Sequence, residues 1–467
     1  MPTEIAITPV TGVPFGEGHS NFTNPIMNQF DLLKHNRFLP IFCTQFLGAL
    51  NDNVFKNAIV ILIAFSLADK MGANSSILVI TAAGIFILPF FIFSATAGQL
   101  ADKFEKSMLI RRIKLVEIVI MCVASLGFYL MSAPILLTVL FFMGMQSALF
   151  GPLKYSILPQ HLSEEELLGG NGMIQMGTYM AILLGTIIGG ILITMNPGGS
   201  FYVSTLIILL ATVGWVASRS IPEASAPEPS LRINWNFFTE THKIIKFSRE
   251  DRTVFWAIIG ISWFWFYGAT FLSLVPTYTR DVLNADERIA TLMLTAFSIG
   301  IGTGSLMCEK LSRRKINLGL VPIGAIGLTL FATDLSFISL PEIEFLEGNS
   351  LLTAGMFLEH FNHWRVLIDL SMIGLSGGLY MVPLYVLVQQ KSNPCHRSRI
   401  IAANNIINAF FMVISAISMI FLISVGIEIP EMFFIVAILN LMVMVVIFKK
   451  EPEFLKQFFK YVSNCRI

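Results

Sequence analysis

The stretch SILVITAAGIFILPFFIFSATAGQLADKFEKSMLIRR (residues 76–112) decides the fold class. Its first 26 residues (76–101) carry no charge, whereas its last eleven carry six charges. A transmembrane helix needs about 20 predominantly apolar residues, each adding about 1.5 Å of length. The stretch therefore predicts a helix that crosses a bilayer and ends at a charged membrane surface.

The whole chain repeats this pattern. Of its 467 residues, 55% are hydrophobic and only 13% are charged, whereas soluble domains have about 25% charged residues. This charge deficit excludes a soluble enzyme and predicts an all-α polytopic membrane protein. Twelve apolar stretches predict twelve transmembrane helices: 38–68, 76–101, 108–131, 134–158, 168–194, 200–219, 254–279, 288–310, 316–336, 365–390, 398–425 and 430–448.

The distribution of lysine and arginine predicts the orientation. With the N-terminus inside, the inner segments hold 26 of the 31 basic residues and the outer loops hold four. Because cytoplasmic loops are enriched in these residues, both termini are expected in the cytoplasm. The predicted organisation is a cytoplasmic tail (1–37), a six-helix half (38–219), a cytoplasmic linker with a surface helix (220–253), a second six-helix half (254–448) and a cytoplasmic C-terminal tail (449–467).

The two halves share a sequence block. Superposing Pro152 on Pro383 aligns the ends of spans four and ten, and two pairs of amides then correspond within two residues in the following spans. These pairs are Asn171/Gln175 and Asn404/Asn408. Two related six-helix halves are a common architecture of secondary transporters that work by alternating access. Chance similarity between two proline-containing apolar helices is the alternative reading.

The loop GQLADKFEK (98–106) resembles the signature loop of the major facilitator superfamily, with Glu105 where glycine is usual. An aspartate at a helix end can accept from a neighbouring helix N-terminus and pair with bases, so Asp102, Lys103 and Lys106 are predicted gating residues. The second copy, GSLMCEKLSRRK (304–315), has Cys308 or Glu309 near the aspartate position, so the second latch is expected to be degenerate.

Three further strings resemble bacterial lysophospholipid transporters: GALNDNVFKNA (48–58), GPLKYSILPQ (151–160) and the region from VPLY to NAFFMV (382–413). The resemblance is strongest to the branch related to transport domains fused to 2-acylglycerophosphoethanolamine acyltransferase. It implies a flippase in the bacterial inner membrane that moves lyso-phosphatidylethanolamine and lyso-phosphatidylglycerol for reacylation. Membrane lipids and an acyltransferase/acyl-carrier-protein synthetase are then the implied partners. A proton-coupled exporter of drugs or other small amphiphiles is the alternative, and a non-transporting anchor for an acyltransferase is a third hypothesis.

The first span contains a candidate headgroup site. Asp52 lies 14 residues into the span, about 21 Å along the helix, and Lys56 is on the same face at i, i+4. Ionised groups at this depth are costly unless they are paired or hydrated. We predict that Asp52 and Lys56 bind the headgroup, with Asn53 and Asn57 beside them. A self-neutralised structural pair is the alternative.

Other polar residues are predicted to line the space between the halves. Lys154 either meets a lipid phosphate or extends to the membrane surface. The remaining candidates are amides, for which hydrogen bonding between helices is the alternative: Asn171, Gln175, Asn404, Asn405 and Asn408.

The aromatic run WFWFY (263–267) lies too deep in span seven for an interfacial belt. Trp263 and Tyr267 are predicted to contact an acyl chain or an ethanolamine cation. Packing between helices is the alternative. The sequence has no GxxxxGK[ST] phosphate loop and no HxxxxD acyltransferase motif, so we expect no ATP-driven pump, no enzyme activity, no cofactor, no metal site and no nucleic-acid partner.

Overall fold

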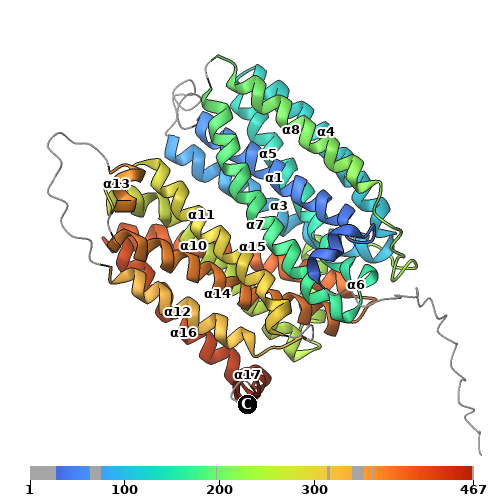
Figure 1. Ribbon diagram of the computed structural model, residues 1–467. Coiled ribbons are helices and arrows are strands. Elements are labelled where there is room, and N and C mark those ends of the chain that lie inside the picture. Colours follow the sequence, from blue (N-terminus) through green and yellow to red (C-terminus); the bar gives the residue numbers. More distant parts are fainter. Residues whose placement is uncertain are drawn as a thin grey trace, which may run out of the picture.

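A computed structural model describes residues 28–63, 75–195, 197–312, 316–338, 352–359 and 361–464. Within these ranges the chain is helical, and each of the twelve predicted spans is a helix (Figure 1). The N half contains α1 (Leu39–Leu62), α3 (Ser75–Lys103), α4 (Lys106–Tyr129), α5 (Ala133–Ser156), α7 (Glu164–Thr194) and α8 (Gly199–Ser218). The C half contains α10 (Arg252–Asp281), α11 (Glu287–Leu311), α12 (Leu320–Ser336), α14 (Phe361–Lys391), α15 (Arg397–Ser424) and α16 (Ile429–Lys450).

The helices begin where the local sequence supplies caps. Asp251 accepts hydrogen bonds from the backbone N–H groups of Thr253 and Val254 at the start of α10. Ser163 and Glu166 form a capping box at the start of α7. Such caps satisfy N–H groups that have no partner inside the helix. In the described part of the chain, nine helices are long and apolar enough to cross a membrane; α1 and α4 are not among them, nor is the 17-residue α12.

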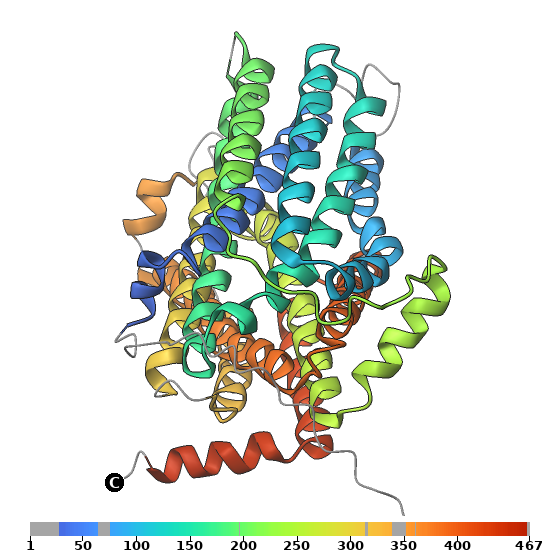
Figure 2. The ribbon, with the colours of Figure 1, turned by 90° about the vertical axis from the view of Figure 1, so that its right-hand side faces the viewer.

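Short elements lie outside the twelve spans. They are η1 (Gln29–Lys34), α6 (Leu158–His161), α9 (Phe237–Ser248), α13 (Ala354–Glu359) and α17 (Glu453–Asn464). The linker between α8 and α10 contains α9, as the sequence predicts. In contrast, α17 was predicted only as a tail; it lies across one end of the bundle in Figure 2. Its Phe454 is buried and its Gln457 accepts a hydrogen bond from the backbone N–H of Leu318, so the bundle anchors this helix.

We call the end of the bundle that carries the α8–α10 linker the linker end, and the opposite end the far end. The buried apolar residues of the N half divide between these ends. Those near the linker end, such as Ile41, Leu153 and Leu168, form one continuous cluster with the core of the C half. Those toward the far end, such as Val54 and Leu136, form a separate cluster. The two halves therefore share a core only at the linker end.

The helix pairs that join the halves are related by the internal repeat. In one pair α3 packs against α15, and in the other α7 packs against α11. Likewise α5 contacts α15 while α14 contacts α7. In the numbering of the predicted spans, these four pairs are two and eleven, five and eight, four and eleven, and ten and five. Each contact thus has a counterpart in the other half, as expected for two related halves.

Candidate functional site

A group of charged side chains lies inside the N half. Asp52 on α1 accepts a 2.7 Å hydrogen bond from Ser147 Oγ on α5 through Oδ2, while its Oδ1 is buried without a partner. Among the described residues Asp52 forms no ion pair; the ammonium of Lys56 instead lies 5.4 Å from the centre of the Phe86 ring. Both side chains are half-buried. The self-neutralised pair considered from the sequence is therefore not what the structure contains.

Lys154 belongs to the same group. It is half-buried on α5, with its Nζ 4.6 Å from the centre of the Tyr155 ring. Asp52 and Lys114 are the charges that act on it, the first attractive and the second repulsive. Lys154 therefore faces the Asp52 charge inside the bundle. Asp52, Lys56 and Lys154 together are called the charged site below.

A second ion pair lies behind the charged site. Lys114 Nζ and Glu117 Oε2 on α4 are 2.7 Å apart, with only 1% and 2% of their side chains exposed. Asn51 and Gln146 donate to the two oxygens of Glu117 at 2.9 and 2.8 Å. Ser147 connects this network to Asp52, because its hydroxyl lies 3.2 Å from Gln146 Oε1. A buried ion pair with further hydrogen bonds is satisfied in place, so it fixes α1, α4 and α5 around the charged site.

The position of Lys114 corrects one part of the predicted orientation, the set of basic residues expected at the inner membrane surface. It is one of the 26 bases that the sequence assigns to inner segments, yet it is buried within α4, directly against Gly48. Lys106 and Arg399, also counted there, are buried as well. Three bases of that group therefore contact protein rather than a membrane surface.

Asn53 and Asn57 are not part of the charged site. Asn53 donates to the backbone oxygen of Ala49 and packs against Gly185 of α7. Asn57 donates to the backbone oxygen of Thr186 at 2.6 Å. One helical step turns this stripe of α1 toward α7 rather than toward α5, and the role of these two amides as headgroup ligands stays a prediction.

Several predicted lining amides instead join helices at the linker end. Asn171 of α7 exchanges two hydrogen bonds with Gln389 of α14, at 2.7 and 3.0 Å, and is fully buried. Asn405 lies against Gly151 of α5. Gln175 is 2% exposed, and its Nε2 has no partner among the described residues. For Asn171 and Asn405, contact between the halves replaces the predicted exposure to substrate.

Asn404 and Asn408 lie in a polar cluster next to a pair of stacked aromatic rings. The rings of Tyr155 and Tyr385, one from each half, are parallel within 11° with centres 4.5 Å apart. Trp265 Nε1 donates to the Tyr385 hydroxyl at 3.4 Å. The side-chain amide of Asn408 lies 2.7 Å from Ser262 Oγ. This cluster forms a closed contact between the halves, and both amides are buried in it.

Trp263 and Tyr267 face the core of the C half. The indole N–H of Trp263 donates to Asn440 Oδ1 at 2.7 Å, and the hydroxyl of Tyr267 donates to the backbone oxygen of Leu328 at 2.8 Å. Both are buried, so they pack within the C half in this structure, and their contact with substrate stays a prediction. Trp265, between them in sequence, is the half-buried tryptophan that points toward Tyr385.

The predicted gating residues lie at the junction of α3 and α15, which we call the ionic seam. Asp102 accepts from the backbone N–H of Ser398 at 3.2 Å and from Arg399 Nε at 2.9 Å. Arg399 also pairs with Glu228 of the linker. Asp102 therefore accepts from a helix N-terminus and pairs with a base, as its position predicts. Lys103 lies over Phe104, and Lys106 is buried nearby.

Glu105 explains why glycine is absent from the loop. Its backbone has negative φ, and its carboxylate caps α4 by accepting from the N–H groups of Ser107 and Met108. It also accepts from the N–H of Ala224 in the linker at 2.7 Å. Burial raises the pKa of Glu105, but these hydrogen bonds outweigh burial and hold the pKa below its usual value. The carboxylate thus ties the linker to α4.

The counterpart of the ionic seam, between α7 and α11, is formed by small residues, and we call it the glycine seam. A Cβ on Gly172 would lie 2.6 Å from the backbone oxygen of Ser305, and one on Gly302 would lie 3.3 Å from Met176. Glu309 accepts from the backbone N–H of Gln29 in η1. Residues 313–315, which follow α11, lie outside the described ranges, so the degenerate second latch stays a prediction.

Every hydrogen bond that directly joins the two halves, among those formed by described residues, lies at the linker end. No three histidine, cysteine, aspartate or glutamate side chains in the described ranges are placed to hold a metal ion. The charged site consists of one carboxylate and two ammonium groups, with the hydroxyl of Ser147 beside them.

The sequence pattern of the Major Facilitator Superfamily matches residues 41–406. The chain belongs to the Major Facilitator Superfamily. It is similar to curated members of this superfamily over most of its length. It is 25% identical to the lysophospholipid transporter LplT of Serratia proteamaculans over 82% of this chain and 87% of that one. It is 26% identical to LplT of Yersinia pestis over 75% of this chain and 78% of that one.

Solved members of the superfamily share the fold at low identity. The human organic anion transporter MFSD10 (TETRAN) has a TM-score of 0.69 and 12% identity, covering 88% of this chain and 99% of that one. FucP in the outward conformation has a TM-score of 0.64 and 12% identity, covering 89% and 100%. At this identity the likeness concerns the arrangement of helices.

In this superfamily member, the residues that sequence reasoning missed are mostly partners of those it identified. Ser147, Gln389 and Arg399 each complete a contact made by a predicted residue, whereas Glu117 pairs with Lys114 behind the charged site. One signal was available for Glu117: an acid three residues after Lys114 within an apolar span. The contacts of Ser147, Gln389 and Arg399 depend on which helices pack together. A single sequence does not show this, so no such signal was available for these three residues.

Proposed function

We propose that this chain moves lysophospholipids such as lyso-phosphatidylethanolamine and lyso-phosphatidylglycerol across the bacterial inner membrane by alternating access. The similarity to the LplT proteins supports this substrate class. The observation that carries the proposal is the charged site, where the half-buried residues Asp52, Lys56 and Lys154 place a carboxylate and two ammonium groups inside the N half. By contrast, the ion pair behind it is closed.

The charges of the site match a zwitterionic headgroup. Lys56 and Lys154 would bind the phosphate, which both substrates carry, as point charges. Asp52, with one carboxylate oxygen unpartnered, would accept from the ammonium group that only lyso-phosphatidylethanolamine carries. The single acyl chain would remain among apolar side chains. No catalytic step is assigned to this chain in the proposal, and reacylation belongs to a separate acyltransferase partner.

The direction of access follows from where the halves join. Their hydrogen bonds and their shared apolar core lie at the linker end, so this end is proposed to be closed and the substrate to enter from the far end. We assign the linker end to the cytoplasm, since the lysine and arginine residues concentrate there. Rocking of the N half against the C half would then open the linker end and release the headgroup.

The test is transport by purified protein in liposomes, measured as the lysolipid that albumin extracts from the outer leaflet over time. We expect Lys56→Ala and Lys154→Ala to reduce transport of both lysolipids at least tenfold. Asp52→Asn should reduce transport of lyso-phosphatidylethanolamine far more than that of lyso-phosphatidylglycerol. Asp281→Asn, which removes an exposed carboxylate at the far end of α10, is the matched control and should transport normally.

Two results would contradict the proposal. Normal transport by all three variants, at normal amounts in the membrane, would remove the charged site from the mechanism. Failure of the wild-type protein to move either lysolipid, together with proton-dependent export of an amphiphilic dye, would establish the alternative function.

A further inference from the structure

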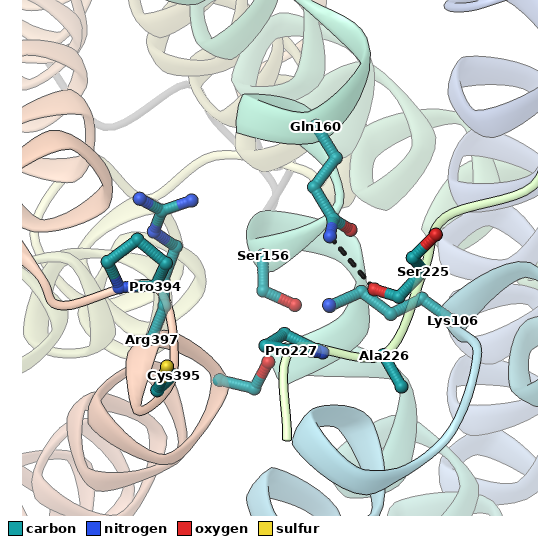
Figure 3. Close-up of a pocket in the computed structure, with 10 residues that line it drawn as sticks. Lys106, Ser156, Gln160, Ser225, Ala226, Pro227, Pro394, Cys395 and Arg397 are labelled. Atoms are coloured by element: carbon teal, nitrogen blue, oxygen red, sulfur yellow. Dashed lines mark hydrogen bonds between the residues drawn. The ribbon is translucent and has the colours of Figure 1, made fainter. Parts of the chain in front are cut away.

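A pocket at the linker end lies between the two halves and outside the charged site. It has a volume of about 260 Å³ and is lined by residues of α4, α5, α6, the linker and the start of α15 (Figure 3). Since a water molecule occupies about 30 Å³ of liquid, the pocket has room for a small anion with several waters. The N half and the C half both contribute to its wall.

The lining is basic and contains no carboxylate among the described residues. Lys106, from the first turn of α4, and Arg397, from the first turn of α15, both face the pocket. Lys106 is 1% exposed, and its Nζ forms no ion pair or hydrogen bond with a described residue. Arg397 makes one long hydrogen bond, 3.5 Å to the backbone oxygen of Ser392, and its Nε is buried without a partner.

The nearby acids are already engaged. Asp102 accepts from Arg399 and from the backbone of Ser398, and Glu105 accepts from backbone N–H groups of α4 and of the linker. Neither is therefore available to neutralise Lys106 and Arg397 by direct contact. Lys106 and Arg397, from opposite halves, repel one another across the pocket, while the Asp102 carboxylate attracts both. An anion bound between the two bases would remove their repulsion.

Two buried hydroxyl groups supply further donors. Ser156 of α5 and Ser398 of α15 are 1% and 0% exposed, and the hydroxyl oxygen of each has no partner. Figure 3 shows the Ser156 hydroxyl and the Lys106 ammonium pointing toward one another across the pocket. Buried polar groups nearly always have a hydrogen-bond partner. Here two hydroxyls and the Nε of a guanidinium lack a partner, and an ammonium lines the same pocket.

We propose that this pocket binds a phosphate group, and that the bound phosphate holds the linker end closed by bridging Lys106 and Ser156 of the N half to Arg397 and Ser398 of the C half. A tetrahedral oxyanion accepts from several donors at once, and charge-assisted hydrogen bonds are the stronger kind. Opening of the linker end separates the donors and releases the anion. The phosphate can be free in the cytoplasm or part of an anionic lipid headgroup.

Cys395 provides a readout specific to this pocket, because its thiol is exposed and lines the wall. The experiment uses the full-length chain with Cys395 as its only cysteine, replacing Cys43, Cys122 and Cys465 by serine and Cys308 by alanine. The rate of maleimide labelling is measured in phosphate-free detergent, with inorganic phosphate replacing chloride at constant ionic strength, and in nanodiscs containing phosphatidylglycerol without free phosphate.

We expect labelling to slow several-fold in at least one arm. Slowing by inorganic phosphate identifies the free anion, and slowing only in the anionic nanodiscs identifies the lipid headgroup. Lys106→Ala and Arg397→Ala should abolish the protection, whereas Arg112→Ala, which removes an exposed base of α4, should keep it. If either alanine variant fails to fold, Lys106→Gln and Arg397→Gln replace them.

Labelling that is unchanged in both arms would overturn the proposal, as would protection that persists equally in the Lys106 and Arg397 variants. The test does not depend on transport. Its failure would leave the proposed lysophospholipid site intact, and normal transport by the charged-site variants would leave the phosphate pocket intact.

Discussion

The ionic seam and the glycine seam join the same two halves at the same end, with opposite chemistry. At the ionic seam, Asp102 and Arg399 are paired with side chains 0% and 2% exposed. At the glycine seam, Gly172 lies against the backbone of Ser305. Both seams bring helix backbones close together, since a Cβ on Gly98 would lie 2.8 Å from Arg399 Cα. Among the described residues, the ionic seam adds a buried charge pair between Asp102 and Arg399.

This difference gives the seams different costs of separation. A buried ion pair is satisfied only when closed or when both charges reach water, so intermediate positions are unfavourable. Small-residue contacts are held by van der Waals packing and weaken gradually as the helices move. We therefore infer that the ionic seam selects between two discrete states, while the glycine seam guides the movement.

The largest effect is expected from breaking the ionic seam. Arg399→Ala leaves Asp102 buried without its partner, which should destabilise the closed arrangement by about 3–5 kcal/mol. The midpoint of thermal unfolding should fall and transport should drop. Lys103→Ala, beside the same loop, is the matched control. Because a buried pair can often be replaced by apolar residues, Asp102→Leu with Arg399→Met should recover the midpoint, and failure to recover it would contradict the pairing argument.

A smaller effect is expected from crowding the glycine seam. Gly172→Ala places a Cβ 2.6 Å from the Ser305 oxygen, and such overpacking costs about 1–3 kcal/mol. Gly214→Ala is the control, because there the nearest atom to the new Cβ is 3.7 Å away. That control should be neutral or stabilising, since alanine favours helix over glycine by about 1 kcal/mol. Equal unfolding midpoints for the two variants would show that the seam is not close-packed.

The amide contact between the seams should matter less. Removing one partner of the Asn171–Gln389 exchange leaves a buried amide unsatisfied, at a cost of about 1–3 kcal/mol for each single alanine variant. The double variant should cost less than the sum of the two single changes, because neither amide is then left without its partner. Additive changes in the unfolding midpoint would mean that the two amides do not interact.

The smallest effect concerns the linker. The pKa of Glu105 is lowered in the folded protein, so its stabilising contribution is complete above the unfolded pKa of about 4.3 and is lost as pH falls through the folded value. The contribution of a half-exposed carboxylate should stay below about 1 kcal/mol. Glu105→Gln should remove this part of the acid dependence of the unfolding midpoint; an unchanged acid dependence would exclude Glu105 as its source.

Sequence reasoning located the elements well and the side-chain environments less well. Each predicted span is a helix, and the contacts of Asp102 follow from its position after span two. The differences concern direction: Asn57 and Trp263 are on the predicted helices but face α7 and the C-half core. A helical face is set by its neighbours, and those neighbours are distant in sequence.

The sequence by itself determined the membrane fold, the number of spans and the related halves. The length of each apolar segment and the placement of its flanking charges are local properties, and they decide whether and how the segment crosses a bilayer. Only the tertiary structure decided which polar residues are closed off and which keep accessible surface. Lys114 and Lys154 illustrate this: both are lysines in apolar spans, yet one is sealed against Glu117 and the other belongs to the charged site. Burial and pairing depend on contacts between helices, and in this chain these contacts form between residues up to 297 positions apart.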